Sequence, residues 1–263
     1  MIPYFEAPTF HLGPLTIAPF GIFVALGVYL ASRVLVALAA RKSLPTRALA
    51  DYAFWGLIGG LIGGHLMHVL LYHPEELSKS PLQLFKIWDG LSSTGGLLGG
   101  VVAAIIFFRH RKVAFWDFGD EFALAVPIGW TIARIGCFVV HDHPGVHTQF
   151  FLAVRFADGP RHDLGLYDAL WLATIALVVW VLQERKLLAG RRLALAGLLY
   201  SCGRIFFDTL RSTDLSYVDK RYFGLTPAQY FCIALICFCV YRLVKPVPWT
   251  YRGVPAKALA TSA

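Results

Sequence analysis

The chain has 263 residues, of which 57% are hydrophobic and 15% are charged, and its mean hydropathy is positive. Soluble domains carry about 25% charged residues, so the composition excludes an ordinary soluble domain and is typical of an integral membrane protein. The formal net charge of +8 would suggest nucleic acid only if the basic residues formed one patch. They flank apolar segments instead, and we expect no nucleic-acid partner.

Seven apolar segments of roughly 17–25 residues are long enough to cross a bilayer as helices. They cover residues 17–41, 52–72, 92–108, 118–140, 166–183, 193–210 and 226–244. The fourth and the sixth qualify only if their polar residues face the protein interior. Because these runs do not alternate with the period of a strand, a β-barrel is excluded. We therefore expect an all-α integral membrane protein with a single membrane-embedded domain over residues 1–263.

The basic residues are distributed unevenly over the connections between these segments. Fourteen Lys and Arg follow the first, third, fifth and seventh segments, and seven lie on the opposite side. By the positive-inside rule, the N-terminus is outside and the tail at 245–263 is cytoplasmic. The first segment lacks a basic leader and a cleavage site, so we expect it to remain as a span. The connection at 141–165 becomes an outer-face loop region.

Two arginines, Arg134 and Arg204, lie deep inside apolar segments. A guanidinium in a membrane span costs ~2.5–3.5 kcal/mol on insertion scales and is retained mainly where it faces a partner or a site. Arginine also binds phosphate through two parallel hydrogen bonds. This pair predicts a site for an anionic headgroup. The alternative is an intramembrane ion pair that only locks the helices together.

Other polar residues are predicted to gather at the same, outer end of the bundle. Arg204, Asp208 and Arg211 are spaced by four and then three residues, which places them on one helix face. The others are His65, His68, Tyr72, Tyr167, Asp168 and the run from Trp88 to Gly96. Since nearly all the polar residues of the spans fall there, we expect a site open to the outer leaflet.

The loop sequence HDHPG, from His141 to Gly145, resembles a metal-binding stretch. A tetrahedral zinc site needs further ligands, for which His147 and His162 are the candidates. We expect a loop that contacts the headgroup, with no metal and no other cofactor.

Glycine pairs in the second and third segments have small-xxx-small spacing, which predicts close helix contact or close approach to a lipid. They are Gly59-Gly60, Gly63-Gly64, Gly95-Gly96 and Gly99-Gly100. The five cysteines all fall within predicted spans, where free cysteine behaves as a small hydrophobe, so we expect no disulfides.

Four fragments, in order, resemble the prolipoprotein diacylglyceryl transferase family. They are LFKIWDGLSSTGGLLGG at 84–100, ARIGCFVVHDHPG at 133–145, RHDLGLYDAL at 161–170 and GRIFFDTLRSTD at 203–214. The resemblance implies a seven-helix enzyme of the bacterial inner membrane with the orientation derived above. It implies transfer of diacylglycerol from phosphatidylglycerol to the lipobox cysteine of preprolipoproteins, with release of glycerol phosphate.

The resemblance also implies roles for individual residues. Arg134, Arg204, Asp168 and Asp208 would be catalytic, the two aspartates standing where the family usually has glutamate. Substrate-binding residues would be Arg134, Arg204, Arg211, Tyr167, Gly145, Thr94, Gly95, Gly96, His65 and Tyr72.

Four positions depart from the family pattern. Thr94 replaces a histidine, Cys137 an asparagine, Phe20 a tyrosine and His65 an arginine. Threonine is no base near neutral pH, whereas the imidazole that it replaces is one. His65, His141 or His143 would have to activate the thiol, or the local field would. Two alternatives stay open: a paralogue that binds an anionic phospholipid without this activity, and a transferase with a different acceptor.

Overall fold

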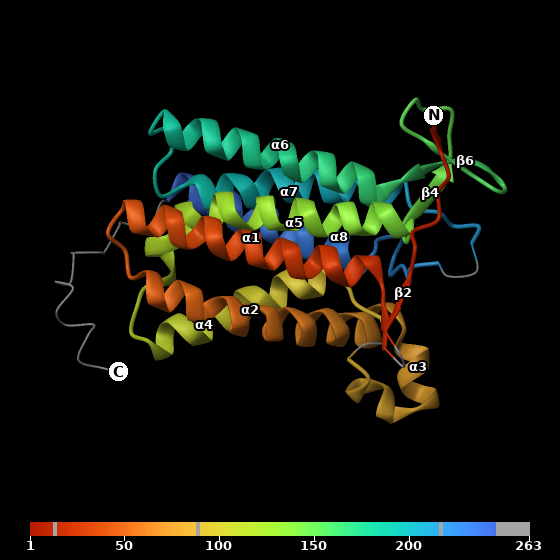
Figure 1. Ribbon diagram of the computed structural model, residues 1–263, viewed down its shortest axis with the longest axis horizontal. Coiled ribbons are helices and arrows are strands. Elements are labelled where there is room, and N and C mark those ends of the chain that lie inside the picture. Colours follow the sequence, from red (N-terminus) through yellow and green to blue (C-terminus); the bar gives the residue numbers. More distant parts are fainter. Residues whose placement is uncertain (13–14, 88–89, 216–217, 246–263) are drawn as a thin grey trace.

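The computed structural model describes residues 1–12, 15–87, 90–215 and 218–245. Seven helices of 18 residues or more lie side by side in this part of the chain (Figure 1). They are α1 (Pro19–Arg41), α2 (Thr46–Met67), α4 (Ser93–His110), α5 (Gly119–Val140), α6 (Leu164–Glu184), α7 (Arg192–Thr209) and α8 (Pro227–Val244). The predicted set of helices is confirmed. The largest boundary difference is that α2 begins six residues before the predicted 52.

Six of these helices are long and apolar enough to cross a membrane. The spanning stretches of two of them extend beyond the α-helix, to Tyr72 after α2 and from Phe115 before α5. The exception is α7, which carries three charged residues in 18: Arg192, Arg204 and Asp208. At 1.5 Å per residue α7 is still about 27 Å long, and it runs alongside the others (Figure 1). The direction in which the bundle crosses a membrane remains a prediction.

The two ends of the bundle differ in their connections. At one end lie the links α1–α2, α4–α5 and α6–α7, which carry ten of the fourteen basic residues counted above (Figure 1). At the other end lie the N-terminus, the strands and the short helix α3 (Pro74–Lys79) (Figure 1). The predicted tail falls almost entirely at 246–263, outside the described residues, as do Trp88 and Asp89.

A small sheet caps the end that holds the N-terminus. It has the order β1-β5-β6-β4, from Ile2–Pro3, Val154–Phe156, Gly159–Asp163 and Pro144–His147. β6 is antiparallel to β4 and β5, and β1 is parallel to β5. A second pair, β2 (Phe10–Leu12) and β3 (Leu15–Ile17), is antiparallel. The expectation of an all-α protein with a loop at 141–165 is wrong here, because strands of two to five residues are too short to show an alternating pattern.

Glycines hold α2 against α4. A Cβ at Gly63 would lie 2.6 Å from the carbonyl oxygen of Gly95, and one at Gly99 would lie 2.1 Å from that of Gly59. No real side chain fits such a space, so the two backbones touch. The interpretation as packing residues is confirmed for Gly59, Gly63, Gly95 and Gly99.

Buried charges also occur at the opposite, basic end. Arg192 lies 3.1 Å from Asp120, and Lys42 pairs with Glu121, which is fully buried. Both acidic residues lie in the first turn of α5, where they also face the positive end of the helix dipole. The expectation that nearly all polar residues of the spans share one end is therefore wrong, and helix-locking ion pairs exist in this protein.

Candidate active site

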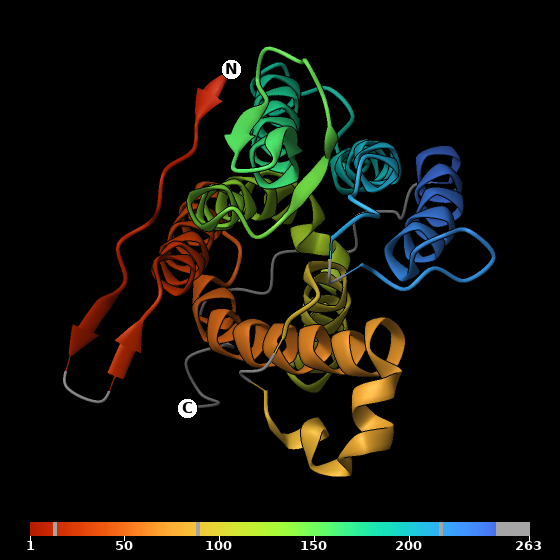
Figure 2. The same ribbon diagram turned by 90° about the vertical axis from the view of Figure 1, so that its right-hand side faces the viewer.

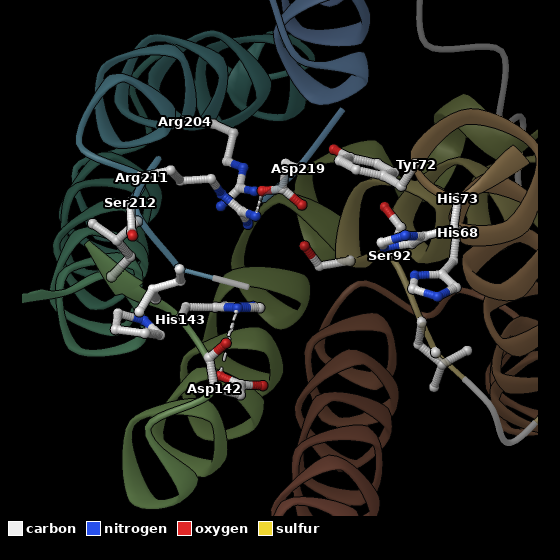
Figure 3. A pocket seen from close by; sticks show the side chains of 16 residues that line it. His68, Tyr72, His73, Ser92, Asp142, His143, Arg204, Arg211, Ser212 and Asp219 are labelled. Atoms are coloured by element: carbon white, nitrogen blue, oxygen red, sulfur yellow. Dashed lines mark hydrogen bonds and ion pairs between the residues drawn. The ribbon is translucent and has the colours of Figure 1, made fainter. Parts of the chain in front are cut away.

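A cavity of about 260 Å³ opens at the end of the bundle that carries the sheet. Its walls come from the end of α2, the start of α4, the turn after α5 and the chain from α7 onward (Figure 3). The polar side chains that line it include Tyr72, Ser92, Ser93, Asp142, His143, Arg204, Arg211 and Asp219. These segments lie far apart in sequence, so only the packed bundle creates the cavity.

Two guanidinium groups share the carboxylate of Asp168 behind this cavity. Asp168 Oδ2 lies 3.1 Å from Arg134 Nη2 and 3.0 Å from Arg204 Nη1. All three side chains are at most 4% exposed. Arg134 also donates to Ser93 Oγ at 2.6 Å, which ties α5 to the start of α4. Arg204 lines the cavity, whereas Arg134 lies one layer deeper.

The predicted common face of Arg204, Asp208 and Arg211 is confirmed. Asp208 Oδ1 lies 3.0 Å from Arg204 Nη2 and 3.0 Å from Arg211 Nε. Arg211 also pairs with Asp219, which lies at the cavity and is partly exposed (Figure 3). Thr226 donates its hydroxyl hydrogen to Asp208. The three arginines of the site are thus balanced by three aspartates, and Asp219 is the most exposed of them.

His143 and Asp142 line the cavity beside these arginines (Figure 3). His143 Nδ1 lies 2.8 Å from the carbonyl oxygen of Asp142, which only accepts, so Nδ1 carries the hydrogen and Nε2 keeps its lone pair. Burial lowers the pKa of His143 well below its usual value, and the charges of Arg211, Arg134 and Arg204 lower it further. Burial raises the pKa of Asp142 to about 6.

The other two candidate bases lie outside the cavity lining. His141 Nδ1 is 2.6 Å from Asp163 Oδ2, and its ring packs against those of Tyr4 and Phe5. Both ring nitrogens of His65 face backbone carbonyl oxygens, that of Gly90 at 3.2 Å and that of Gln83 at 2.9 Å. Among the three candidates, His143 is the one whose ring faces the cavity.

Several residues that the resemblance assigned to substrate binding contact other parts of the protein and do not line the cavity. Thr94 is fully buried, and its hydroxyl has no hydrogen-bond partner among the described residues. A Cβ at Gly95 would meet the carbonyl oxygen of Gly63, whereas Gly96 is less crowded. The Tyr167 hydroxyl lies 2.8 Å from His162 Nδ1. Neither Thr94, Gly95, Gly96 nor Tyr167 lines the cavity, but Tyr72 does.

Gly145 lets the sheet approach the end of α7. A Cβ there would lie 2.5 Å from the carbonyl oxygen of Leu210, and the next residue, Val146, donates its N–H to that oxygen at 2.8 Å. Gly145 also forms an isolated bridge with Arg211. The absence of a side chain at Gly145 therefore helps to set the position of Arg211.

Arg161 connects the chain after α7 to the sheet through hydrogen bonds. Its buried guanidinium donates to Asp158, to both carboxylate oxygens of Asp214 at 3.0 and 2.6 Å, and to the Gly145 carbonyl at 3.1 Å. These bonds hold the pKa of Asp214 and that of Asp158 below their usual values. The short stretch from Arg211 to Asp214 is fixed in this way.

Sequence reasoning did not single out several residues of the cavity. Asp142 belongs to the HDHPG stretch and Ser93 to the Ser-Ser-Thr run, so a signal existed for both. Asp219 and His73 carry no motif, and only the fold brings them to the cavity. Cys137 was noted as a departure from the family, and its Sγ lies 3.6 Å from Arg134 Nη1.

Known proteins match almost the whole chain. The family model for prolipoprotein diacylglyceryl transferase matches residues 8–245. A phosphatidylglycerol–prolipoprotein diacylglyceryl transferase of Pseudoalteromonas atlantica is 33% identical over 276 residues, covering 99% of this chain and 97% of that protein. Proteins of the same name from Chromohalobacter salexigens and Gluconobacter oxydans are 31% and 30% identical, covering 93% and 94% of this chain and 95% and 96% of those proteins.

Proposed function

The chain belongs to the prolipoprotein diacylglyceryl transferase family, and we propose that it transfers the diacylglyceryl group of phosphatidylglycerol to the lipobox cysteine of preprolipoproteins. The observation that carries this proposal is the cavity where Arg204 and Arg211 stand together, with Arg134 directly behind. Guanidinium groups bind phosphate oxygens through two parallel hydrogen bonds, so the headgroup phosphodiester of a phospholipid suits this cavity. The substrate class comes from the full-length similarity to proteins named phosphatidylglycerol–prolipoprotein diacylglyceryl transferase.

The arginines would bind the phosphate and then stabilise it as a leaving group. In the reaction the thiol gives up its proton to a neighbouring base or to water, and its sulfur attacks the glyceryl carbon. The bond from carbon to phosphate oxygen breaks, and glycerol phosphate leaves with that electron pair. The charge that develops on this oxygen lies where Arg204 and Arg211 face the cavity. Asp219 is their most exposed counter-ion, so the entering phosphate would displace it from Arg211.

We further propose that the bundle lies in the bacterial inner membrane with its sheet outside and its C-terminal tail in the cytoplasm. The excess of basic residues at the opposite end supports this orientation. The cavity would then open at the outer leaflet, where an exported lipoprotein precursor arrives.

A mass-spectrometric transfer assay tests the function. Purified protein is mixed with phosphatidylglycerol and a lipobox peptide, and the peptide cysteine should gain one diacylglyceryl mass. Arg204→Ala should abolish the gain, because the leaving phosphate loses its contact. Arg33→Ala is the matched control, since Arg33 is an exposed arginine on α1, and it should keep full transfer.

The same assay separates the two remaining functions. If phosphatidylglycerol binds to wild type but no peptide is modified, the protein binds lipid without this transfer. If phosphatidylglycerol is consumed while the peptide stays unmodified, the acceptor is a different molecule. Both alternatives rest on Thr94, which is buried beside the cavity-lining Ser93 and provides no base.

A further inference from the structure

Three potential metal ligands meet at the wall of the cavity. They are Cys137 in the last turn of α5 and Asp142 and His143 directly after its end, and their ligand atoms all lie within 4.8 Å of one another. His141 between them has φ 50°, which reverses the chain so that Asp142 and His143 return toward the face of Cys137. We propose that these three residues form a zinc site that binds and activates the acceptor thiol.

The donor set selects the metal. A thiolate sulfur, an imidazole nitrogen and a carboxylate oxygen together suit Zn²⁺, whereas Mg²⁺ and Ca²⁺ prefer oxygen ligands alone. Catalytic zinc sites have three protein ligands and one open position. Metal–ligand bonds of about 2.0–2.3 Å place tetrahedral ligands roughly 3.3–3.8 Å apart, so small side-chain rotations close this cluster.

The groups around the cluster fit a metal site. His143 Nδ1 lies 2.8 Å from the Asp142 carbonyl oxygen and 3.7 Å from Asp142 Oδ1. A ring that binds the metal through Nε2 would keep its Nδ1 bond to this carbonyl, and zinc-bound histidines are usually oriented by such a bond. Arg134 donates to Cys137 Sγ, as a hydrogen-bond donor to a bound thiolate does. The charges also balance: three arginines face three aspartates, so the Cys137 thiolate and the Asp142 carboxylate are left to neutralise Zn²⁺.

The open position faces the reacting groups. Asp142 and His143 line the same cavity as Arg204 and Arg211, so a ligand on the metal would lie beside the phosphate (Figure 3). Cys137 is buried and is not among the residues that line the cavity, so a metal held by the three residues would keep its cavity side free. A site on the far face of these residues would be unable to take part in the transfer.

The mechanism rests on the function proposed above. A zinc ion held by Cys137, Asp142 and His143 would favour the thiolate form of the lipobox cysteine, whose thiol proton would pass to solvent water. The sulfur lone pair then forms the bond to the glyceryl carbon. The electron pair of the broken bond from carbon to oxygen leaves with glycerol phosphate, and the product is a neutral thioether, which would be a weaker metal ligand than the thiolate. No base is required at Thr94.

Cobalt substitution tests the site without depending on activity. Full-length protein, purified without a polyhistidine tag, is equilibrated with Co²⁺ alone and then examined by absorption spectroscopy and metal analysis. We expect about one Co²⁺ per chain and a thiolate-to-cobalt charge-transfer band. Cys137→Ser should lose the band, and His143→Ala should lose the metal. The controls Cys202→Ser and His110→Ala, which alter exposed residues outside the cavity, should keep both.

Two results would overturn the site: folded wild-type protein that binds no cobalt, or a cobalt band that survives Cys137→Ser. The transfer assay tests separately whether the bound metal takes part in the reaction. Removal of the metal by a chelator should abolish transfer while phosphatidylglycerol stays bound, and added Zn²⁺ should restore it. Transfer that continues without metal would overturn the mechanism and leave His143 as the base, with the proposed function intact. A bound metal without any transfer would count against the proposed function and not against the site.

Discussion

At the scale of single residues, Asp168 is the electrostatic centre of the site. Its carboxylate is the shared counter-ion of Arg134 and Arg204, and all three side chains are removed from solvent. Without it, two guanidinium groups would face each other in a medium that screens charge poorly. The intramembrane-pair alternative of the sequence analysis is therefore partly true: the arginines are held by an ion pair, and one of them still reaches the cavity.

Asp168→Asn should destabilise the protein by ~3–5 kcal/mol, because it leaves the buried guanidinium of Arg134 without its acidic partner. Asp168→Glu keeps the charge and should cost much less. Asp51→Asn is the control, since Asp51 pairs with Arg111 at the surface and should contribute ~0–1 kcal/mol. Unfolding in detergent, monitored by circular dichroism, measures all three. Equal effects of Asp168→Asn and Asp51→Asn would contradict this prediction, because the Asp168 carboxylate would then stabilise the protein no more than a surface ion pair does.

At the scale of the elements, helix contacts place the walls of the cavity. The glycine contact between α2 and α4 brings Tyr72, at the end of the α2 span, close to Ser92 and Ser93 at the start of α4. In a bilayer such contact depends on packing rather than on water exclusion, so small residues at the interface are needed. The sequence spacing predicted this contact, but not that it also shapes the cavity.

Gly99→Ala should separate α2 from α4, since its Cβ would lie 2.1 Å from the carbonyl oxygen of Gly59. Overpacking of this kind costs about 1–3 kcal/mol. Gly100→Ala lies one residue further along the same helix, and its nearest neighbour would be 3.8 Å away. We expect a lowered Tm for Gly99→Ala and an unchanged or raised Tm for Gly100→Ala. The reverse order would show that α2 and α4 are not in backbone contact.

At the scale of the whole molecule, the bundle has a basic end and a capped end. The basic connections share one end (Figure 1), and the sheet lies at the other end, which faces the viewer in Figure 2. The cavity opens at the same end as the sheet. Buried ion pairs occur at both ends, so burial of charge does not by itself identify the site. The two ends differ in that the capped end has the cavity that Arg204 and Arg211 line.

Reporter fusions test the orientation. Green fluorescent protein at the C-terminus should fluoresce, because it folds in the cytoplasm, whereas alkaline phosphatase at that position should be inactive. Alkaline phosphatase fused after Asp158, in the turn between β5 and β6, should be active. The exchange of the two reporters between the two positions is the matched control. The opposite pattern would place the cavity on the cytoplasmic side and contradict the proposed entry of exported precursors.

The sequence by itself determined the seven helices, the common face of Arg204, Asp208 and Arg211, and the glycine contact between α2 and α4. These follow from periodicity and from apolar length, which are local properties of a chain in a bilayer. Tertiary structure alone decided that Asp168 pairs with both arginines, that Asp219 meets Arg211, and that Cys137 lies beside Asp142 and His143. Such contacts join side chains from different elements or across a chain reversal, and they depend on how the helices pack, which no local pattern encodes.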